Sequence, residues 1–427
     1  MQTAPKKVIN AWAMYDWANS AYSLIITSAI FPAYYTAIAP DQVHFIGRTY
    51  DKTALASYAI SFSFLVIAFL SPVLSSIADY KGTKKGFMQF FCYLGSAACI
   101  ALTFLTKDNV PFGIVCSILG SIGFCGSIVF YNSYLPEIAA EEDQDRVSAK
   151  GFAMGYIGSV LLMVVCLVFI MLNDAKNLGW GAWPARLSFL AVGLWWTGFA
   201  QITFRHLPRS VASNQHPEHS IFTNGFHELK KVWNQLQDYP VTKRFLRSFF
   251  FYNMGVQTVM YLATYFASAE LHLQSSELII TVLLIQLVAI AGAMLFARLS
   301  VRTNNILTLG VIILIWIGIC VFAYFVQTPM QFYVLATIVG LVMGGIQSMS
   351  RSTYSKLIPP TKDTASYFSF YDVCDKIGTV IGTLSFGFIG EVFGGLRNSV
   401  LALMIFFIVG GILLLFVDMK QKTVVAA

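Results

Sequence analysis

Charged residues are scarce in this sequence: Asp, Glu, Lys and Arg make up 11% of its 427 residues, against about 25% in an ordinary soluble protein. Hydrophobic residues make up 57%. So little charge excludes a soluble multidomain enzyme, a disordered chain and a nucleic-acid-binding protein, whose basic residues would gather on one polar face. The composition is that of a chain whose segments lie in a lipid bilayer.

The usual motifs of metal binding and catalysis are also missing. The seven Cys occur without a CxxC pair, so the sequence predicts neither a disulfide framework nor a zinc site. It contains no P-loop, no HExxH motif and no Ser/His/Asp set, and we therefore expect no enzyme activity, no cofactor and no metal. The glycosylation acceptor N-x-S/T is absent too, which favours a bacterial inner membrane over a glycosylating secretory pathway.

Long apolar runs are the main feature that is present. A helix needs about 20 predominantly apolar residues to cross the hydrocarbon layer. Twelve windows meet that need, near 9–38, 54–78, 86–106, 111–135, 151–173, 184–204, 245–269, 277–297, 305–327, 330–354, 366–389 and 398–418. We predict an all-α membrane protein with twelve transmembrane helices in two six-helix pseudo-repeat bundles, 1–205 and 244–427, joined by a cytosolic linker at 206–243.

Apolar residues recur at helical spacing in this linker, which predicts a short amphipathic helix. They are Phe222, Phe226, Leu229, Val232, Trp233 and Leu236. Such a helix either lies along the membrane surface or only docks the linker against the bundles, and the sequence leaves both readings open.

The two halves resemble each other faintly. Residues 157–160 read Ile-Gly-Ser-Val and residues 377–380 read Ile-Gly-Thr-Val, an offset of 220 that also superposes Tyr134 on Tyr354. One offset for two successive helix pairs indicates a duplication. Chance identity among apolar residues is the alternative.

The basic residues are distributed unevenly between the two sides of the membrane. With the N-terminus inside, the cytosolic segments hold 21 of the 28 Lys and Arg, the outer segments hold six, and Lys376 falls inside the eleventh window. An excess of Lys and Arg marks the cytosolic side. The net charge of +7 therefore indicates topology, with both termini cytosolic, rather than an affinity for acidic partners.

A few ionisable residues remain inside the apolar windows, and each one needs a partner, water or a proton there. In the first window, Asp16 lies within a polar stripe with Tyr15, Asn19 and Tyr22. We expect this stripe to hold a substrate or a proton, with a structural hydrogen-bonded interface as the alternative.

The eleventh window carries Asp372, Asp375 and Lys376 within one turn. The pair Asp372 and Lys376 has the i,i+4 spacing of a helix ion pair, which would leave Asp375 as a spare acid. Asp375 is then the candidate proton carrier, or it is a second partner for Lys376.

Further polar residues fall where helices that line a central cavity would carry them. Arg351 lies near the inner end of the tenth window, where it can bind a carboxylate or extend to the interface. The expected substrate-binding residues are Tyr15, Asp16, Asn19, Tyr22, Asn132, Tyr134, Tyr252, Asn253, Gln257, Gln347 and Arg351. The expected proton-coupling residues are Asp16, Asp372, Asp375 and Lys376.

The loop after the second window contains the first specific motif. The run from Ser75 to Lys85 reads SSIADYKGTKK and resembles the cytosolic signature of the major facilitator superfamily. Asp79 can bind the positive N-terminal end of a neighbouring helix, while Gly82 makes the turn and Lys84 or Lys85 supplies a counter-charge. We expect these four residues to form a gate, and the resemblance implies the same. The corresponding loop at 297–302 lacks the Asp and the Gly, so a second gate of this kind is in doubt.

Four further motifs narrow the resemblance. They are YDWANSAY at 15–22, NSYLPE at 132–137, GYIGS at 155–159 and GGIQSMSRS at 344–352. Together they look like the autophagy-related vacuolar amino-acid effluxers and their bacterial relatives. The family often has an acid after Tyr-Asn in the seventh helix, where this chain has Met254. We therefore expect that coupling chemistry has moved to the eleventh helix and Asp375.

The resemblance implies a twelve-helix transporter that moves a small polar solute, an amino acid above all, by alternating access. Proton coupling is an additional expectation. A membrane receptor or lipid scramblase on the same scaffold is the alternative. We expect a small-molecule solute, protons and the lipid bilayer as partners, no nucleic acid, and a monomer.

Overall fold

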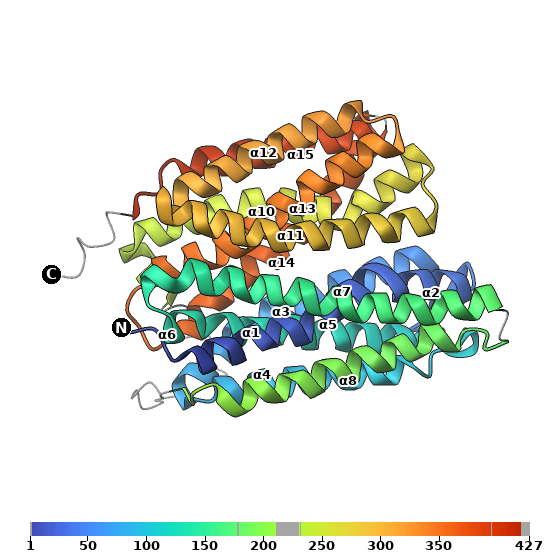
Figure 1. Ribbon diagram of the computed structural model, residues 1–427, viewed down its shortest axis with the longest axis horizontal. Coiled ribbons are helices and arrows are strands. Elements are labelled where there is room, and N and C mark those ends of the chain that lie inside the picture. Colours follow the sequence, from blue (N-terminus) through green and yellow to red (C-terminus); the bar gives the residue numbers. More distant parts are fainter. Residues whose placement is uncertain (1, 177–178, 211–229, 231, 394, 420–427) are drawn as a thin grey trace.

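The computed structural model describes residues 2–176, 179–210, 230, 232–393 and 395–419. Long helices run side by side along the molecule, the N-terminal half in blue to green and the C-terminal half in yellow to red (Figure 1). Both described ends of the chain lie on one side of this bundle. We call this side the termini side and the opposite one the hairpin side.

The N-terminal half contains six long helical segments and several short elements. Its elements are α1 (Lys6–Ala21), η1 (Tyr22–Ala29), α2 (Ile30–Ile38), β1 (Gln42–Phe45), β2 (Arg48–Asp51), α3 (Lys52–Lys81), α4 (Lys84–Leu102), η2 (Lys107–Asn109), α5 (Val110–Ser133), α6 (Leu135–Ile138), η3 (Glu141–Asp143), α7 (Gln144–Lys176) and α8 (Trp183–His206).

The described part of the C-terminal half, from 240 onward, adds six helices. They are α10 (Pro240–Leu271), α11 (Ser275–Arg302), α12 (Asn305–Phe325), α13 (Pro329–Leu357), α14 (Thr364–Phe393) and α15 (Leu396–Leu414). Within the described residues, eleven helical segments are long and apolar enough to cross a membrane. The remaining long helix, α10, is less apolar because it carries Asn253 and Gln257 on its inner face. Each of the twelve predicted windows thus has its helix.

A π-helical turn interrupts the first predicted span. Residues 9–38 were expected to form one helix, but η1 separates α1 from α2. In this wider turn the Ser28 hydroxyl donates to the carbonyl of Ser23 at 3.0 Å. Such π-bulges are frequent at functional sites, and here Ser23 and Thr27 line the central cavity.

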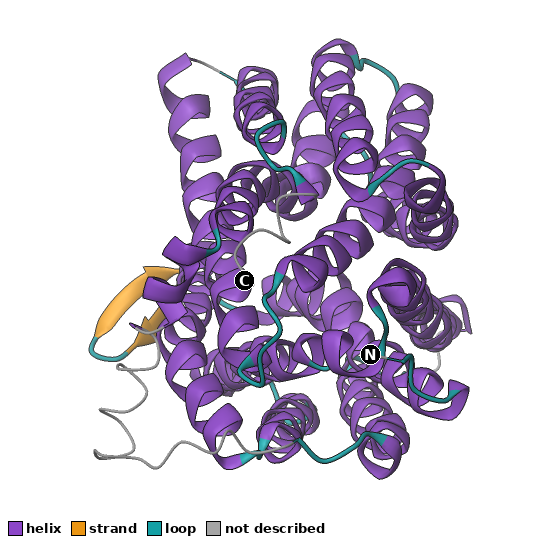
Figure 2. Cartoon of the chain, turned by 90° about the vertical axis from the view of Figure 1, so that its left-hand side faces the viewer, coloured by secondary structure: helices purple, strands orange, loops and turns teal. Residues whose placement is uncertain are grey.

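A short β-hairpin that the sequence did not predict joins α2 to α3. Strands β1 and β2 pair antiparallel (orange in Figure 2), and the turn between them holds Ile46 and Gly47 at positive φ. The hairpin ends at Asp51, whose carboxylate caps α3 by accepting from the backbone N–H groups of Thr53 and Ala54. The Thr53 hydroxyl also donates to Asp51, and this hydrogen bond, followed by the two backbone ones, holds the pKa of Asp51 below its usual range.

The buried apolar side chains form two large clusters, one for each half. The first runs from Ile9 to Leu207 and takes one residue, Ala365, from the other half. The second runs from Val232 to Val417 and takes in Tyr156. Two separate cores fit the predicted division of the chain into two bundles. The boundaries of that division stay a prediction.

The described part of the linker is helical over 232–238. Val232 and Leu236 are buried in the C-terminal core, whereas Trp233 is exposed. The other residues of the predicted amphipathic helix, Phe222, Phe226 and Leu229, lie outside the described residues.

Glycines set how closely α11 approaches α13. A Cβ at Gly292 would overlap the carbonyl oxygen of Leu341, and one at Gly344 would overlap that of Ala289. Small residues of this kind let the backbones of membrane helices pack directly against each other.

This packing predicts the effect of one added methyl group. Gly292→Ala must push α11 away from α13, and we expect it to destabilise the protein by about 1–3 kcal/mol, as overpacking of a core does. The matched control is Gly310→Ala on α12, where the new Cβ meets nothing within 4 Å. Melting temperatures of the purified proteins should fall for the first variant only; equal values for both would contradict the close packing.

Candidate functional site

A cavity of about 250 Å³ lies between the two halves. Five charged side chains line it: Asp16 and Arg351, and the group Asp372, Asp375 and Lys376 on α14, which we call the α14 triad. Neutral polar groups come from helices of both halves, including Asn19, Ser20, Ser23, Thr27, Ser28, Asn132, Ser159, Asn253, Gln257, Gln286, Gln347, Ser350 and Thr379.

The structure brings most of the predicted site residues to this cavity. Its lining includes Asp16, Asn19, Asn132, Asn253, Gln257, Gln347, Arg351, Asp372, Asp375 and Lys376. Four predicted tyrosines are not part of the lining. Each of these four phenols packs inside one half of the protein or lies toward the termini side, and so does not reach the cavity.

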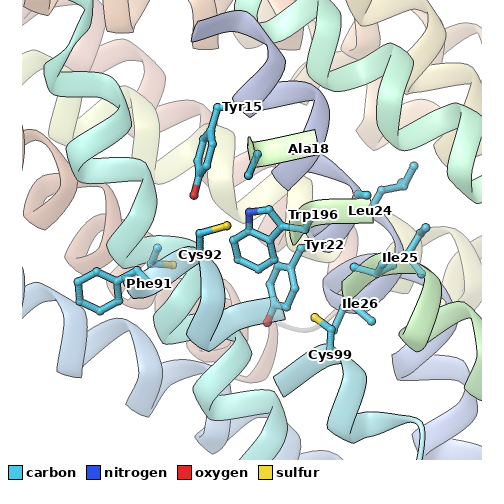
Figure 3. Close-up of a cluster of buried hydrophobic side chains, with 14 of the residues drawn as sticks. Tyr15, Ala18, Tyr22, Leu24, Ile25, Ile26, Phe91, Cys92, Cys99 and Trp196 are labelled. Atoms are coloured by element: carbon cyan, nitrogen blue, oxygen red, sulfur yellow. The ribbon is translucent and has the colours of Figure 1, made fainter. Parts of the chain in front are cut away.

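Tyr15 and Tyr22 lie in the core of the N-terminal half, beside Cys92 and Trp196 (Figure 3). The ring of Tyr15 packs against Tyr131 with centroids 5.2 Å apart. The ring of Tyr22 stacks on Phe124 at 5.1 Å and borders only the second, outer cavity.

Tyr134 bonds to a group outside the cavity, and Tyr252 bonds to a lining residue, Ser350, without lining the cavity itself. The Tyr134 hydroxyl donates to the carbonyl of Pro208 at 3.2 Å, at the start of the linker. The Tyr252 hydroxyl lies 2.8 Å from the Ser350 hydroxyl and is buried.

An ion pair across the two halves forms the floor of the cavity. Arg351 of α13 lies 3.2 Å from Asp16 of α1, and both side chains are almost fully buried. The Tyr131 hydroxyl donates to the same Asp16 oxygen at 2.7 Å. Arg351 also donates to the Asn132 side chain at 3.2 Å, and to the hydroxyl and the carbonyl of Ser148 at 3.0 and 2.8 Å.

Aromatic rings and a glycine hold this arginine in place. Its guanidinium lies over the ring of Phe152 at 4.1 Å and over that of Trp12 at 4.9 Å, and such cation–π contacts stabilise a desolvated guanidinium. A Cβ at Gly151 would lie 2.5 Å from the Asp16 carboxylate and 2.8 Å from the guanidinium. Gly151 therefore makes the room in which the pair forms.

The α14 triad is paired differently from the sequence interpretation. Lys376 lies 2.6 Å from Asp375 and 3.7 Å from Asp372. Asp375 also accepts from Asn253 at 2.7 Å and Gln257 at 2.9 Å. The expected i,i+4 pair of Asp372 and Lys376 is present as the longer contact, and Asp375 is not spare. The geometry fits the alternative in which Asp375 is a second partner of Lys376, and Asp372 is the acid with fewer partners.

Two residues of the predicted gate, Asp79 and Lys84, form a buried cluster on the termini side. Asp79 accepts from the backbone N–H groups of Ala365 and Ser366, at 3.2 and 2.7 Å, at the start of α14. This is the contact with a helix N-terminus that the motif predicts, and its role as a gate stays a prediction. Lys84 lies 3.0 Å from Asp79, pairs with Glu137 and donates to the Thr364 hydroxyl at 2.6 Å.

The other two residues of the motif act at its edges. Gly82 ends α3 at a φ of 64°, a conformation that glycine adopts without strain. Lys85 donates to the carbonyl of Leu207 at 3.1 Å, within its own half, and so lies apart from the gate cluster.

A second buried charge cluster lies on the termini side. It forms although the loop at 297–302 lacks the Asp and the Gly of the motif at 75–85. Asp145 of α7 lies 2.7 Å from Lys356 of α13. It also accepts from Asn305 at 2.7 Å and from Ser300 at 2.8 Å. In both clusters the acid belongs to the N-terminal half. In the first its partners across the interface are backbone N–H groups of α14, and in the second they are the side chains of Lys356 and Asn305. A second charge contact between the halves is thus present on the termini side without the motif, and its role as a gate stays a prediction.

Tyr156, Tyr131 and Gln286 are site residues that the sequence analysis missed. The Tyr156 hydroxyl donates to Gln347 across the cavity at 2.6 Å. Tyr156 lies in the GYIGS motif at 155–159, and this motif was the sequence signal that could have identified it as a site residue. Tyr131 and Gln286 lie inside apolar windows with no distinguishing pattern.

The polar contacts described above that join the two halves lie at the cavity or toward the termini side. Toward the hairpin side, a second cavity of about 200 Å³ continues from the first between η1, α3 and α5. Phe64, Tyr261 and Lys376 line both cavities.

Comparison with known proteins gives one consistent result. A family model described as vacuole effluxer Atg22 like matches residues 4–427. The Bacillus subtilis (strain 168) protein YxiO, described as an uncharacterized MFS-type transporter, is 33% identical over 97% of this chain and 95% of its own length. Autophagy-related protein 22-1 of Penicillium rubens is 24% identical over 90% of this chain and 78% of its own length.

Solved structures of similar fold are major facilitator transporters. The fucose:proton symporter FucP of E. coli superposes with a TM-score of 0.69 at 16% identity, over 96% of this chain and 98% of that one. The human organic anion transporter MFSD10 gives 0.71 at 11% identity, over 96% and 99%. The predicted twelve-helix major facilitator fold is confirmed.

The second charge cluster generates a test of its contribution to stability. Asp145→Asn leaves the buried Lys356 ammonium without its counter-charge, which costs about 3–5 kcal/mol in a buried pair. We expect a clear fall in melting temperature, and partial recovery in the double variant Asp145→Asn/Lys356→Met. The matched control is Arg146→Met, which removes an exposed partner of Asp143 and should cost at most about 1 kcal/mol. A control that falls as far as Asp145→Asn would refute the assignment.

Proposed function

This chain belongs to the Atg22-like vacuole effluxer family of major facilitator transporters, and we propose that it moves a small polar solute across a membrane by alternating access. The observation that carries the proposal is the charged cavity between the halves, with the Asp16–Arg351 pair across its floor. Ionic side chains are costly in a membrane protein and mark solute or ion pathways.

Alternating access requires that contacts on one side break while others form on the opposite side. In this conformation the termini side is held by the Asp79 and Asp145 clusters and by the floor pair. The second cavity leads from the site toward the hairpin side. The arrangement fits a state in which solute exchanges with the hairpin side and is blocked from the other.

An amino acid is the solute that fits the cavity chemistry best. The cavity walls carry charges of both signs, which can bind an ammonium group and a carboxylate of one zwitterion. They also hold buried polar atoms without a hydrogen-bond partner among the described residues, the Nδ2 of Asn19 and the Oε1 of Gln286. A solute with its own acceptor and donor can satisfy both when the cavity closes around it.

The floor pair suggests how such a solute acts on the transporter. Arg351 donates hydrogen bonds to Asp16, Asn132 and Ser148, all in the N-terminal half. These bonds must break for the termini side to open. A zwitterion whose ammonium replaces Arg351 at Asp16, and whose carboxylate replaces Asp16 at Arg351, leaves both charges paired after the halves separate.

The distribution of Lys and Arg supports placing the termini side in the cytosol. We propose the inner membrane of a bacterium as the location, with both termini cytosolic. The hairpin side then faces outward.

Uptake by proteoliposomes tests the transport function. With a mixture of radiolabelled amino acids as the probe, we expect saturable uptake by the wild-type protein. Asp16→Asn removes the charge from one partner of a buried pair, a loss of about 2–5 kcal/mol, and should lower uptake by a factor of about 30 or more. The matched control Tyr93→Phe changes a half-exposed residue far from the cavity and should transport normally. Amino-acid binding without flux would instead favour a receptor.

Cysteine labelling tests the orientation. Thr49→Cys on the hairpin should react with a membrane-impermeant maleimide in intact bacterial cells, and Lys7→Cys on α1 should react only after lysis. Both positions are exposed, so accessibility in detergent provides the control. The reverse pattern would overturn the proposed topology.

A further inference from the structure

The α14 triad carries one more negative charge than positive charge when all three groups are ionised. Asp375 is well satisfied: one oxygen accepts from Asn253 and Gln257, and the other lies 2.6 Å from the Lys376 ammonium. The Lys376 ammonium also lies 5.4 Å above the ring of Phe64. Asp375 and Lys376 therefore form a complete pair, and the surplus charge falls on Asp372.

Asp372 is buried, with 5% of its surface exposed. Its Oδ2 has no hydrogen-bond partner among the described residues and no surface that water can reach. Its Oδ1 lies 3.7 Å from Lys376, a longer contact than a hydrogen bond. An ionised carboxylate in this setting has lost its hydration, and few hydrogen bonds or ion pairs replace it.

We propose, building on the transport function proposed above, that Asp372 takes up and releases one proton in each transport cycle. Asp375 stays ionised as the permanent partner of Lys376. In the uptake step, a hydronium ion reaching the cavity from the hairpin side transfers its proton to Oδ1, the carboxylate oxygen that is not sealed, and leaves a water molecule. In the release step, water on the termini side takes the proton back.

A proton fits Asp372 better than a metal ion or a substrate ammonium does. Space is the first reason, because Oδ2 is sealed from contact with a water-sized group. Repulsion is the second, since any other cation bound there would lie close to the Lys376 ammonium. A neutral carboxyl group avoids both problems and leaves the triad without net charge.

The groups that face Asp372 favour the same assignment. On α14 they are Asp375, Lys376 and the thiol of Cys374, and from α5 the thiol of Cys125 faces it. The phenol of Tyr261 on α10 faces Lys376 and Asp375. Lys376 is the single cation in this set and Asp375 holds it at 2.6 Å, so Asp372 is the group whose charge is left to be balanced.

Infrared difference spectroscopy tests the proton site without any substrate. The purified protein in nanodiscs is titrated through the neutral range, and the C=O stretch of protonated carboxyl groups is followed. We expect Asp372→Asn to remove one titrating band from the wild-type spectrum. The matched control Asp375→Asn changes the neighbouring acid in the same way and should keep that band at the acid end of the titration.

Each result of this experiment bears on the proposal. A band that persists in Asp372→Asn, or one that only Asp375→Asn removes, overturns it. If Asp372→Asn does not yield folded protein, Asp372→Glu serves as the second variant: an altered but titrating band supports the assignment, and an unaltered spectrum overturns it.

A flux experiment separates this inference from the transport function. In proteoliposomes with the labelled amino-acid mixture, an imposed proton gradient should accelerate wild-type uptake. Asp372→Asn should lose that acceleration while retaining exchange of labelled for unlabelled amino acid. A wild type without amino-acid uptake but with the infrared band refutes the proposed solute and leaves the proton site standing. Unchanged acceleration in Asp372→Asn refutes the proton site and leaves the solute standing.

Discussion

The cost of burying charge between two apolar bundles is the constraint on which the rest of this structure depends. Arg351 lies in the interior, so it must find acceptors there, and it finds them across the interface at Asp16, Asn132 and Ser148. Other features follow from that pair. Gly151 leaves the space that the two side chains fill, and the rings of Phe152 and Trp12 cover the guanidinium. The charge that the membrane disfavours thus becomes the group that holds the halves together.

The two clusters on the termini side both bind an acid of the N-terminal half, but they use different partners in the C-terminal half. In the first, Asp79 of the N-terminal half binds the start of α14, and Lys84 lies beside it. In the second, Asp145 at the start of α7 binds Lys356 and Asn305 of the C-terminal half. The first uses the partial positive charge of a helix N-terminus, and the second uses a side-chain cation. A duplicated chain can therefore keep a contact in place while the residues that make it change.

Much of the architecture was readable from the sequence because apolar length alone identifies a membrane span. The Asp79 contact could also be predicted, because the motif contains both the acidic residue and the glycine that makes the turn, Gly82. The sequence did not show which face of each helix turns toward the cavity. Tyr15 and Tyr22 share a face that packs into the N-terminal core, while Asp16 and Asn19 turn toward the cavity. Asp145 was missed because an acid in a charged loop looks ordinary until Lys356 is placed beside it.

The position of the floor pair distinguishes it from the two clusters nearer the membrane surface. When the termini side opens, water can reach the Asp79 and Asp145 clusters directly and replace their lost partners. The pair Asp16 and Arg351 lies deeper, against the cavity, where breaking a buried pair costs about 3–5 kcal/mol unless something replaces the partners. A ligand shifts a conformational equilibrium only by its difference in affinity for the two states. In the proposed cycle, a zwitterion that pairs with both separated charges supplies that difference, and a solute that pairs with neither cannot open the floor.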